Sequence, residues 1–354
     1  MFLNLDRIMT LRRLGRTDLQ VPALCLGTMT WGRQNSPEEG FAQMDMALDH
    51  GLFFWDTAEM YSAPPTPATY GRTEEIIGDW FARTGRRNEV LLASKVVGDG
   101  AGMDYLRGGK ARADRKNIVE AVEASLRRLR TDHIDLYQLH WPDRLADRFG
   151  RAVAHPAAQP GEVPIEETLA VFADLIQAGK VRHVGVSNET PWGTMRYVAA
   201  ADHLGLPRIA SIQNPYSLLN RTFEMGLSEV ALREDVSMLA YSPLAAGTLT
   251  GKYLDGVVPE GSRRAFDHRK SRYDLARGDT ATRDYLSIAR NHGLDPAAMA
   301  IAFVVSRSFV TSTIIGATTM DHLKIAIDAG SLTLSDEVLA ALDAVHATNP
   351  NPCP

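Results

Sequence analysis

The sequence of 354 residues predicts a single (β/α)8 TIM barrel with an N-terminal hairpin and long loops on the catalytic face. Apolar runs of strand length recur along the chain, and segments with helical periodicity separate most of them. Seven runs end in a polar residue or a glycine turn: LFFWD, VLLASK, IDLYQLH, VRHVGVSN, IASIQN, VSMLAYS and STIIGA. Because barrel enzymes carry their chemistry at the carboxyl ends of the strands, the pattern predicts a functional site together with the fold.

The barrel pattern occupies residues 11–348, after a poorly patterned extension over residues 1–10 and before a tail over residues 349–354. Met9 is a candidate start of the protein alongside Met1, because the pattern begins after it. A hairpin is expected over Leu11–Val21, with its turn at Gly15–Asp18, ahead of the first barrel strand PALCLGT.

The helices are expected to alternate with the strands and to close the outer ring. Ser36 and Pro37, followed by two glutamates, predict the first helix start, and this helix ends near His50. The later helices are expected at 72–83, 116–130, 165–178, 191–204, 223–233, 280–292, 296–306, 320–329 and 336–346. Long loops follow the third, fourth and seventh strands, the latter two over 141–164 and 243–279, where substrate choice is usually set.

Composition limits the classes of function. Hydrophobic residues make up 45% and charged residues 23% of the chain, which supports a large core and excludes global disorder. The formal net charge is −5 and no basic stripe is present, so nucleic acid is not an expected partner. There is no apolar run of membrane length and no secretory segment, so we expect a cytoplasmic protein without membrane insertion.

The two cysteines form neither a disulfide framework nor a metal-binding spacing. Cys25 lies in an apolar run and is expected to be a buried thiol. Cys353 is expected in a frayed tail. No metal site is predicted.

Four polar residues near successive strand ends have the chemistry of a proton donor. A free tyrosine titrates near ~10, too high for efficient acid–base catalysis near neutrality. Lys95 beside Tyr61 would favour the phenolate, and Asp56 would hold the lysine charged and oriented. His140 at the next strand end could hydrogen-bond a carbonyl oxygen. The alternative is an Asp–Lys ion pair that closes the barrel, with Tyr61 and His140 packed nearby; four such residues at neighbouring strand ends favour catalysis.

The later strands end in amides and hydroxyls, which suit a nicotinamide nucleotide better than a metal. Ser187, Asn188 and Gln213 offer the donors and acceptors that a carboxamide needs. As a purely structural alternative, Ser187 and Asn188 could cap the helix that begins at Pro191. No G-x-G-x-x-G follows an early strand, so a Rossmann site is not indicated. Gly247–Lys252 resembles a P-loop, but it is one residue short and is followed by Tyr253.

These segments resemble the aldo-keto reductase family over nearly the whole chain. The resemblance rests on GLFFWDTAEMYS, LLASKV, DLYQLHWP, GKVRHVGVSNE, IQNPYSLLNR, AYSPLAAGTLTGKY and STIIGATT in this order. The segments SNET, QNPYSLLNR and GTLTGKY are most similar to its Tas-like branch, which is related to the potassium-channel β-subunits. The resemblance implies Tyr61 as the general acid/base, Asp56 and Lys95 as the residues that tune it, and His140 as the residue that orients the substrate.

The resemblance also implies NADPH as the cofactor. Tyr241 would stack on the nicotinamide ring, a belt with Lys252 would cover the pyrophosphate, and GATT would offer backbone donors and a helix N-terminus to phosphate. The expected cofactor residues are Gly27, Thr28, Met29, Asp56, Ser187, Asn188, Gln213, Tyr241, Ser242, Pro243, Leu244, Ala245, Ala246, Gly247, Thr248, Leu249, Thr250, Gly251, Lys252, Arg263, Gly316, Thr318, Thr319 and His322.

Arg263 and Arg264 are expected either to assist at the phosphates or to be ordinary solvated surface. The sequence departs from the commoner family pattern at two positions. Thr318 stands where many members have Lys or Arg, and Ala326 stands where many have an Asn that contacts adenine. The first departure weakens a strict preference for the 2′-phosphate, and Lys252 with the hydroxyls of Thr318 and Thr319 partly restores it.

The expected function is NADPH-dependent reduction of an aldehyde, ketone or quinone to the alcohol, with Tyr61 as proton donor. Trp31, Met60 and Trp141 would line an apolar pocket or pack in the core, while Trp55 points away from Asp56. Two alternatives remain: a nucleotide-binding regulatory subunit with little turnover, and a barrel lyase or hydrolase that uses Lys95 covalently. The expected partner is a small carbonyl compound, and the sequence leaves the oligomeric state open.

Overall fold

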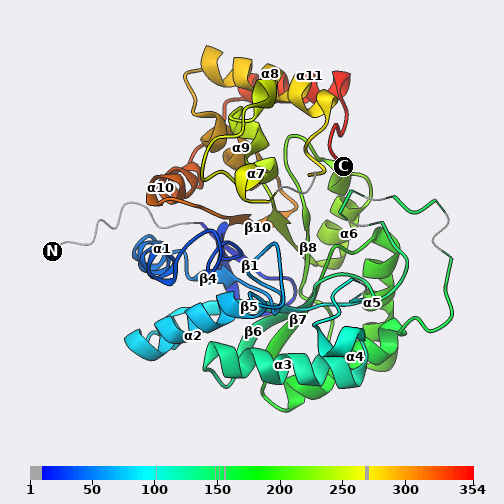
Figure 1. Cartoon of the computed structure of the whole chain (residues 1–354). Helices are drawn as coiled ribbons and strands as arrows, with labels where there is room; N and C mark the ends of the chain where they lie inside the picture. Colours follow the sequence, from blue (N-terminus) through cyan, green and yellow to red (C-terminus); the bar gives the residue numbers. More distant parts are fainter. Residues whose placement is uncertain (1–9, 101, 148, 151, 155–156, 268–270) are drawn as a thin grey trace.

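Eight parallel strands close into a barrel in the computed structural model of the chain, in the order β10–β3–β4–β5–β6–β7–β8–β9 (Figure 1). The structure describes residues 10–100, 102–147, 149–150, 152–154, 157–267 and 271–354. The barrel strands are β3 (Leu24–Gly27), β4 (Phe54–Asp56), β5 (Leu91–Val96), β6 (Ile134–Leu139), β7 (Val181–Ser187), β8 (Ser211–Pro215), β9 (Ser237–Tyr241) and β10 (Val310–Ile315). The predicted TIM barrel is confirmed.

Helices surround the barrel, and all of them except the short helix Arg263–Phe266 bury residues in the core (Figure 1). They are α1 (Pro37–Asp49), α2 (Arg72–Thr84), α3 (Arg115–Leu129), α4 (Ile165–Gln177), α5 (Pro191–Leu204), α6 (Leu227–Glu234), α7 (Arg263–Phe266), α8 (Ala276–Asn291), α9 (Pro296–Val305), α10 (Met320–Ala329) and α11 (Asp336–Thr348). The predicted start of α1 is confirmed, because the Ser36 side chain and Glu39 form a reciprocal capping box.

The predicted start of the sixth helix at residue 223 was wrong. A short 3-10 helix spans Thr222–Glu224, and α6 begins only at Leu227. Between them Gly226 has a φ of 101°, a left-handed conformation that glycine adopts readily and that ends the first turn. The apolar periodicity of the two pieces reads as one helix, which is why the sequence pattern missed the break.

The N-terminal hairpin closes the barrel at the amino ends of the strands. Its strands β1 (Leu11–Arg13) and β2 (Gln20–Pro22) pair in antiparallel register. Leu14 belongs to the same buried cluster as the residues that fill the barrel interior. Gly15 donates its backbone N–H to Ser237 Oγ at 2.7 Å, and a Cβ at Gly15 would lie 2.4 Å from the Ala210 carbonyl oxygen. Only glycine fits this close approach, so the predicted turn also positions the hairpin.

Strand alternation separates the barrel interior from the helical layer. Phe54 belongs to the interior cluster with residues of five other barrel strands, whereas Trp55 packs against Trp80 and Phe81 of α2, with ring centroids 5.1 and 6.1 Å apart. Asp56 is two residues after Phe54 and therefore faces inward again. The predicted opposite orientation of Trp55 and Asp56 is confirmed.

The tail is packed at its end, and the expectation that Cys353 lies in a frayed segment was wrong. Cys353 is fully buried and donates its backbone N–H to the Leu219 carbonyl at 3.0 Å. Gly278 of α8 makes room for it, because a Cβ there would lie 2.6 Å from Cys353 Sγ. Cys25 is buried in β3, as predicted.

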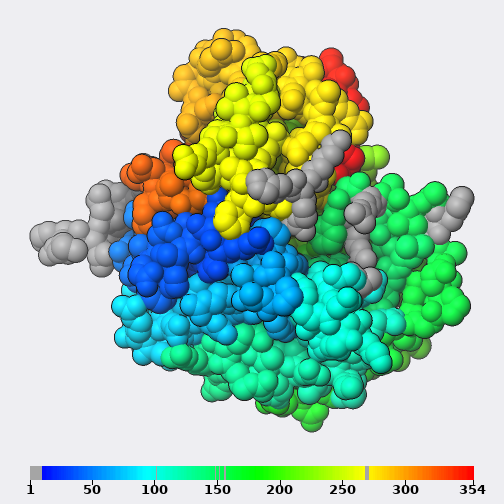
Figure 2. All heavy atoms as spheres, viewed as in Figure 1, coloured from blue at the N-terminus to red at the C-terminus, as the bar shows by residue number. Residues whose placement is uncertain are grey.

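The long loops lie at the carboxyl ends of the barrel strands, as predicted. They follow β5, β6 and β9. Figure 2 shows the yellow segment after β9 against the blue N-terminal elements, where Gln34 Nε2 donates to the Gly261 carbonyl at 2.8 Å. Within the described residues, no helix is long and apolar enough to span a bilayer.

Candidate active site

The carboxyl ends of β4 and β5 bring a buried ion pair into the mouth of the barrel. Lys95 Nζ lies 2.6 Å from Asp56 Oδ2 and donates to the Thr57 carbonyl at 2.9 Å. Both side chains are almost completely withdrawn from solvent, at 0% and 4% exposed. Such a pair is stable only because each group keeps charged or polar partners when it leaves water.

Tyr61 and His140 complete the predicted tetrad. Tyr61 lies in the loop after β4, and Lys95 Nζ is 5.0 Å from the centroid of its ring. His140 directly follows β6, and its ring meets the Tyr61 ring edge-on with centroids 5.8 Å apart. The four residues chosen from the sequence therefore lie together, with the phenol between the lysine and the imidazole.

Burial and neighbouring charges shift the pKa values of Tyr61, Lys95 and His140. Burial raises the pKa of Tyr61, while the charge of Lys95 and its hydrogen bond oppose this rise. The pKa of Lys95 is raised, because attraction to Asp56 and Tyr61 outweighs the lowering effect of burial. Burial and the Lys95 charge keep the pKa of His140 well below its usual range, so this imidazole is neutral near pH 7.

Lys95 does lower the pKa of the phenol, as the sequence predicted, but the net direction is upward. The reason is that burial penalises the phenolate more than one neighbouring cation favours it, since Asp56 partly cancels that cation.

A network of side-chain amides surrounds Asp56 and includes one residue that the sequence analysis missed. Gln213 Nε2 donates to Asp56 Oδ1 at 2.8 Å, and Gln138 Nε2 is 3.3 Å from the same oxygen. Gln213 Nε2 also lies 3.3 Å from Gln138 Oε1. The signal was present in the sequence, because Gln138 is two residues before His140 on β6 and must share its inward face.

The predicted nicotinamide residues form a continuous hydrogen-bonded chain. Asn188 Nδ2 donates to the His140 carbonyl at 2.8 Å and lies 3.1 Å from Ser187 Oγ. The Tyr241 hydroxyl donates to Asn188 Oδ1 at 2.7 Å. Asn188 has a φ of 52°, a left-handed conformation that asparagine tolerates better than most residues and that aims its amide across the strand ends.

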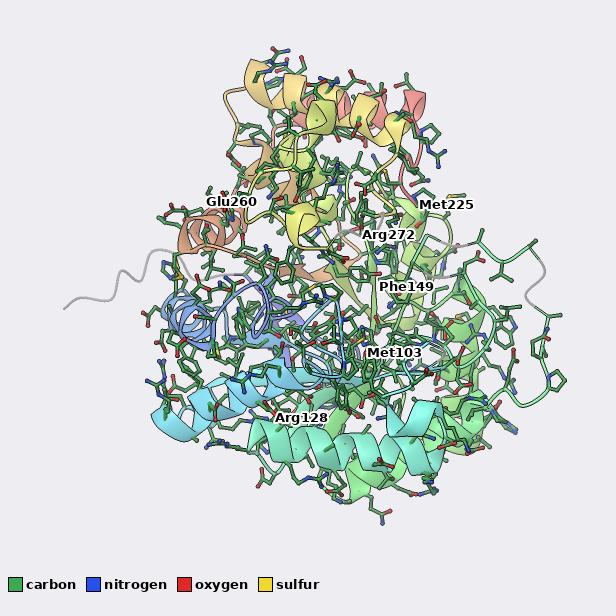
Figure 3. The ribbon with its side chains drawn as sticks, in the orientation of Figure 1. Met103, Arg128, Phe149, Met225, Glu260 and Arg272 are labelled. Atoms are coloured by element: carbon green, nitrogen blue, oxygen red, sulfur yellow. The ribbon has the colours of Figure 1, made fainter. Side chains whose placement is uncertain are left out.

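Arg272 extends this chain, and the sequence analysis did not select it. Its Nη2 donates to the Tyr241 hydroxyl at 3.1 Å, and its guanidinium lies 5.7 Å from the centroid of the Tyr241 ring. Arg272 also adjoins the loop after β6, since a Cβ at Gly150 would lie 3.1 Å from Arg272 Cβ. Figure 3 labels Arg272 near Phe149 in this part of the molecule. The loop after β9 is thus tied to the Tyr241 side of the site.

Aromatic and apolar side chains line the other side of the tetrad. The Trp141 ring lies 4.9 Å from the His140 ring and 5.8 Å from the Phe149 ring. Met60 packs against the buried cluster that contains Trp141. Trp31 is fully buried, donates to Gln43 Oε1 at 2.9 Å, and belongs to the outer core. Of the two readings considered for Trp31, the core one is correct.

The belt after β9 has an unusual backbone. Ser242, Ala245 and Ala246 have positive φ values of 59°, 49° and 57°, and Gly247 and Gly251 are also left-handed. Within Ala245–Thr250, the 3-10 conformation is interrupted by a kink at Ala246 and Gly247. Several left-handed non-glycine residues in one segment are costly, and such strain clusters at ligand-binding sites. Pro243, Leu244, Thr248, Leu249 and Thr250 belong to this same belt.

Two consecutive arginines in the loop after β9 have different surroundings. Arg263 Nη1 lies 3.8 Å from Met29 Sδ, and its charge acts on Tyr61. It therefore lies over the β3 end of the mouth. Arg264 instead pairs with Asp274 at 2.6 Å and lies over the Tyr253 ring at 4.1 Å. Of the two residues, Arg263 is the one that lies near the tetrad.

The loop after β10, where phosphate binding was predicted, has an open backbone next to the start of α10. A Cβ at Gly316 would meet only the Gly27 carbonyl oxygen, at 4.0 Å, so a ligand can approach this backbone closely. Thr319 caps α10 by accepting from the His322 N–H, while Thr318 Oγ1 lies 3.2 Å from His322 Nδ1. Burial and the nearby charge of Lys252 lower the pKa of His322.

Thr28 directly follows β3 and ties it to the end of β4. Thr28 Oγ1 donates to the Asp56 carbonyl at 2.9 Å and is fully buried. A Cβ at Gly27 would lie 2.8 Å from Ile314 Cγ2, so glycine permits the contact between β3 and β10 that closes the barrel.

Three arginine–carboxylate pairs join consecutive loops around the strand ends. Arg107 Nη1 lies 2.7 Å from Glu59 Oε2, and Arg112 Nε donates to Asp143 Oδ1 at 2.8 Å. Arg144 Nη1 donates to Glu189 Oε2 at 2.9 Å. The three carboxylates are 0–3% exposed. The loops after β4, β5, β6 and β7 are therefore joined in sequence.

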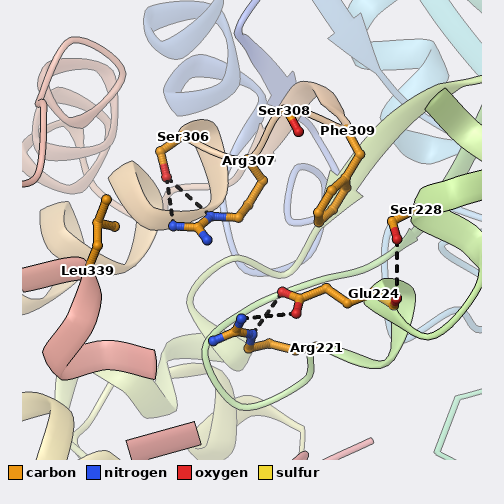
Figure 4. Close-up of a pocket in the computed structure, with 8 residues that line it drawn as sticks. All are labelled: Arg221, Glu224, Ser228, Ser306, Arg307, Ser308, Phe309 and Leu339. Atoms are coloured by element: carbon orange, nitrogen blue, oxygen red, sulfur yellow. Dashed lines mark hydrogen bonds and ion pairs between the residues drawn. The ribbon is translucent and has the colours of Figure 1, made fainter. Parts of the chain in front are cut away.

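Figure 4 shows a surface pocket of about 520 Å³ at a different place in the fold. It is lined by Arg221, Glu224, Ser228, Ser306, Arg307, Ser308, Phe309 and Leu339. Dashed lines join Glu224 to Arg221, which also reaches Asp343 at 2.7 Å. The pocket lies between α6, α9 and α11 and contains no tetrad residue, so the strand ends remain the better candidate site. Among the described residues, no group of three or more His, Cys, Asp or Glu side chains could hold a metal.

Comparisons of the sequence with known proteins identify a family and several relatives. A profile of the Aldo/keto reductase family matches residues 23–347. The Escherichia coli K12 "Protein tas" is 49% identical over 347 residues, covering 98% of this chain and all of that protein. The E. coli O157:H7 "L-glyceraldehyde 3-phosphate reductase" is 30% identical over 345 residues, covering 95% and 92% of the two chains.

A plant relative is named as a channel subunit. The Arabidopsis thaliana "Probable voltage-gated potassium channel subunit beta" is 31% identical over 316 residues, or 88% of each chain. The predicted relation to both the Tas-like branch and the channel β-subunits is confirmed. With a closed parallel barrel and a profile match over nearly its whole length, the chain belongs to the aldo/keto reductase family.

Proposed function

We propose that the protein reduces an aldehyde, ketone or quinone to the alcohol with NADPH, and that Tyr61 donates the proton. The observation that carries the proposal is the position of the Tyr61 phenol between the buried Lys95–Asp56 pair and the neutral His140 ring. An acid beside a carbonyl-orienting donor and next to a buried ion pair is the arrangement needed to protonate a developing alkoxide.

The nicotinamide would supply the hydride when bound. His140 is neutral, so it can donate one hydrogen bond to the carbonyl oxygen without adding a proton of its own. Tyr61 would transfer its proton to that oxygen, and Lys95 would stabilise the phenolate left behind. Asp56 keeps Lys95 charged and oriented, and Gln138 and Gln213 hold Asp56 in turn.

The chain's residues fit the cofactor. Asn188, Ser187 and Gln213 would bind the carboxamide, and the Tyr241 ring would support the nicotinamide. The belt from Ser242 to Lys252 with Arg263 would hold the pyrophosphate. Gly316, Thr318, Thr319 and His322 would hold the adenosine end, where the exposed α10 N-terminus and open backbone suit a phosphate. We propose NADPH in preference to NADH, because the Lys252 charge lies near His322 at this end.

Purified protein is expected to bind NADPH at about 1:1 and to lose tryptophan fluorescence on binding, because Trp141 lies beside His140. Calorimetry gives the stoichiometry, and a fluorescence titration gives the dissociation constant. If calorimetry detects neither NADPH nor NADH, the oxidoreductase proposal fails.

Lys252→Ala is expected to weaken NADPH more than NADH. A charge-assisted contact to the 2′-phosphate would be lost, and such contacts contribute about 1.5–3 kcal/mol, or roughly a tenfold to hundredfold change in affinity. Parallel titrations with both cofactors measure the difference. Equal losses would instead put Lys252 at the pyrophosphate, which both cofactors share.

A regulatory subunit with little turnover is the second candidate function, favoured by the similarity to the channel β-subunit. It predicts tight NADPH binding with negligible NADPH oxidation across a panel of aldehydes, ketones and quinones. Steady-state oxidation with such a panel therefore separates the two functions. Covalent catalysis by Lys95 is disfavoured, since the amine is fully buried and its pKa is raised rather than lowered.

A further inference from the structure

Glu59, which lies between Asp56 and Tyr61 in the sequence, has a buried carboxylate that is not part of the tetrad. Glu59 is fully buried, and its Oε1 accepts the Val97 N–H at 2.9 Å. The Glu59 backbone N–H donates to the Lys95 carbonyl at 3.1 Å. Its main chain thus bonds to Lys95 itself, and its side chain bonds to Val97, two residues further along the chain. A shift of Glu59 would move the Tyr61 loop relative to that lysine.

Arg107 holds the rest of the Glu59 carboxylate. Its Nη1 and Nη2 lie 2.7 and 2.9 Å from Glu59 Oε2 and Oε1, and its side chain is 6% exposed. Its Nε donates to Asn117 Oδ1 at 3.1 Å. A two-bond fork of this kind fixes orientation as well as distance. Tyr70 adds a hydrogen bond from its hydroxyl to Glu59 Oε2 at 3.2 Å.

The backbone of Arg107 is itself in a costly conformation, with a φ of 46°. A residue with a Cβ stays in the left-handed region only where surrounding contacts determine it, and such residues cluster at functional sites. The contacts of its guanidinium with Glu59 and Asn117 are the ones that hold it. The ion pair therefore sets the path of the loop after β5.

That loop carries an apolar wall next to the tetrad. Leu106 directly precedes Arg107 and is buried in one cluster with Val97 and Trp141, against which Met103 and Met60 pack. Figure 3 labels Met103 on this part of the chain. Because Trp141 lies beside His140, the wall borders the place where a carbonyl substrate would sit.

We propose that Glu59 and Arg107 form a positioning pair that fixes the Tyr61 hydroxyl relative to Lys95 and holds the Met103–Leu106 wall against Trp141. The inference rests on the proposed role of Tyr61 as proton donor. Neither residue exchanges a proton with the substrate. Each residue acts by positioning other residues. Glu59 positions Tyr61, and Arg107 positions the Met103–Leu106 wall.

Glu59→Gln is expected to slow hydride transfer by about 10–100-fold, because a displacement of about 1 Å at a reacting group has effects of this size. The carboxamide turns an N–H toward the guanidinium, so one bond of the fork is lost. The NADPH dissociation constant should stay within about twofold, since the cofactor residues are on other strand ends. Stopped-flow NADPH oxidation and a fluorescence titration measure the two quantities.

The matched control is Glu74→Gln. Glu74 is also fully buried and paired with an arginine, since its Oε2 accepts from Arg128 Nε at 2.8 Å, but it lies on the helix side of β5. The Glu74→Gln variant should have a lower melting temperature without a comparable loss in the rate of hydride transfer. If Glu59→Gln and Glu74→Gln slow hydride transfer equally, the Glu59 effect is general destabilisation and the proposal is overturned.

Combining Glu59→Gln with Tyr61→Phe distinguishes positioning from an independent role. Once the hydroxyl is absent, its placement no longer matters, so the double variant should be no slower than Tyr61→Phe alone. Multiplicative losses would show that Glu59 does not act through Tyr61. If Tyr61→Phe is itself without effect, the proposed function fails; if only Glu59→Gln is without effect, only the positioning proposal fails.

Arg107→Lys keeps the positive charge but cannot form two parallel hydrogen bonds to the Glu59 carboxylate. This variant tests the positioning proposal if Glu59→Gln does not fold. It should raise KM for a flat aromatic aldehyde such as 4-nitrobenzaldehyde at least fivefold, with less change for propanal, which does not reach the wall. Equal changes in KM for both aldehydes, or none, would contradict the role of Arg107 in holding the wall.

Discussion

Replacement of Tyr61 by phenylalanine is expected to slow carbonyl reduction by about 10²–10⁴-fold, the usual contribution of a positioned acid. The ring remains in its packing against His140 and near Lys95, so the fold and the NADPH affinity should be retained. What disappears is the proton for the forming alkoxide. Stopped-flow measurement of hydride transfer is the appropriate readout, because release of the cofactor can limit steady-state turnover and hide the loss.

The matched control is Tyr70→Phe, which also removes one partly buried tyrosine hydroxyl from the same face of the barrel. Tyr70 bonds Glu59 and does not belong to the tetrad, so its loss should be far smaller than that of Tyr61→Phe. Near-wild-type hydride transfer in Tyr61→Phe, with chemistry rate-limiting, would rule out Tyr61 as the proton donor.

Lys95→Met is expected to be the second most damaging change, in both activity and stability. Removing one partner of a buried ion pair leaves Asp56 without its cation, which typically costs about 3–5 kcal/mol. Reduction should slow because the pKa of Tyr61, already raised by burial, loses the one lysine that lowers it. Thermal unfolding and stopped-flow kinetics measure the two effects.

The pH dependence of Lys95→Met shows in which direction the pKa of Tyr61 changes. Reduction needs protonated Tyr61, so a higher pKa moves the alkaline loss of reductase activity to higher pH. Oxidation of the alcohol needs the phenolate, so its activity should fall at neutral pH and recover only in more alkaline solution. The double variant Lys95→Met with Asp56→Asn should regain stability but not rate. An unchanged pH profile would mean that Lys95 does not control the Tyr61 proton.

The barrel was predictable because apolar runs of strand length alternate with segments of helical periodicity along the chain. Strand ends marked by Asp56, Lys95 and His140 were identifiable because each polar residue interrupts an apolar run at the point where a parallel strand leaves the core. The break before α6 was not, since Gly226 interrupts the backbone without interrupting the apolar pattern. The packed position of Cys353 depends on a distant partner, the Leu219 carbonyl, for which local pattern carries no signal.

The site was predictable where chemistry and strand position coincide, and less so where a residue acts through a distant neighbour. Gln138 could have been found from its inward face on β6. Glu59 was visible beside Asp56, but its pairing with Arg107 spans 48 positions and no spacing rule predicts it. The sequence left two positions open for Trp31, because the same residue in the same segment could line a pocket or pack behind it.

The three arginine–carboxylate pairs around the strand ends have a consequence for attempts to exchange loops between related enzymes. Each pair has one partner in each of two successive loops, so grafting one loop alone would leave a buried carboxylate or guanidinium without its counterion. Chimeras that replace the loop after β5 should therefore also carry the donor's residues at positions 59 and 143. New specificities on this scaffold would then be inherited as blocks of adjoining loops rather than as single insertions.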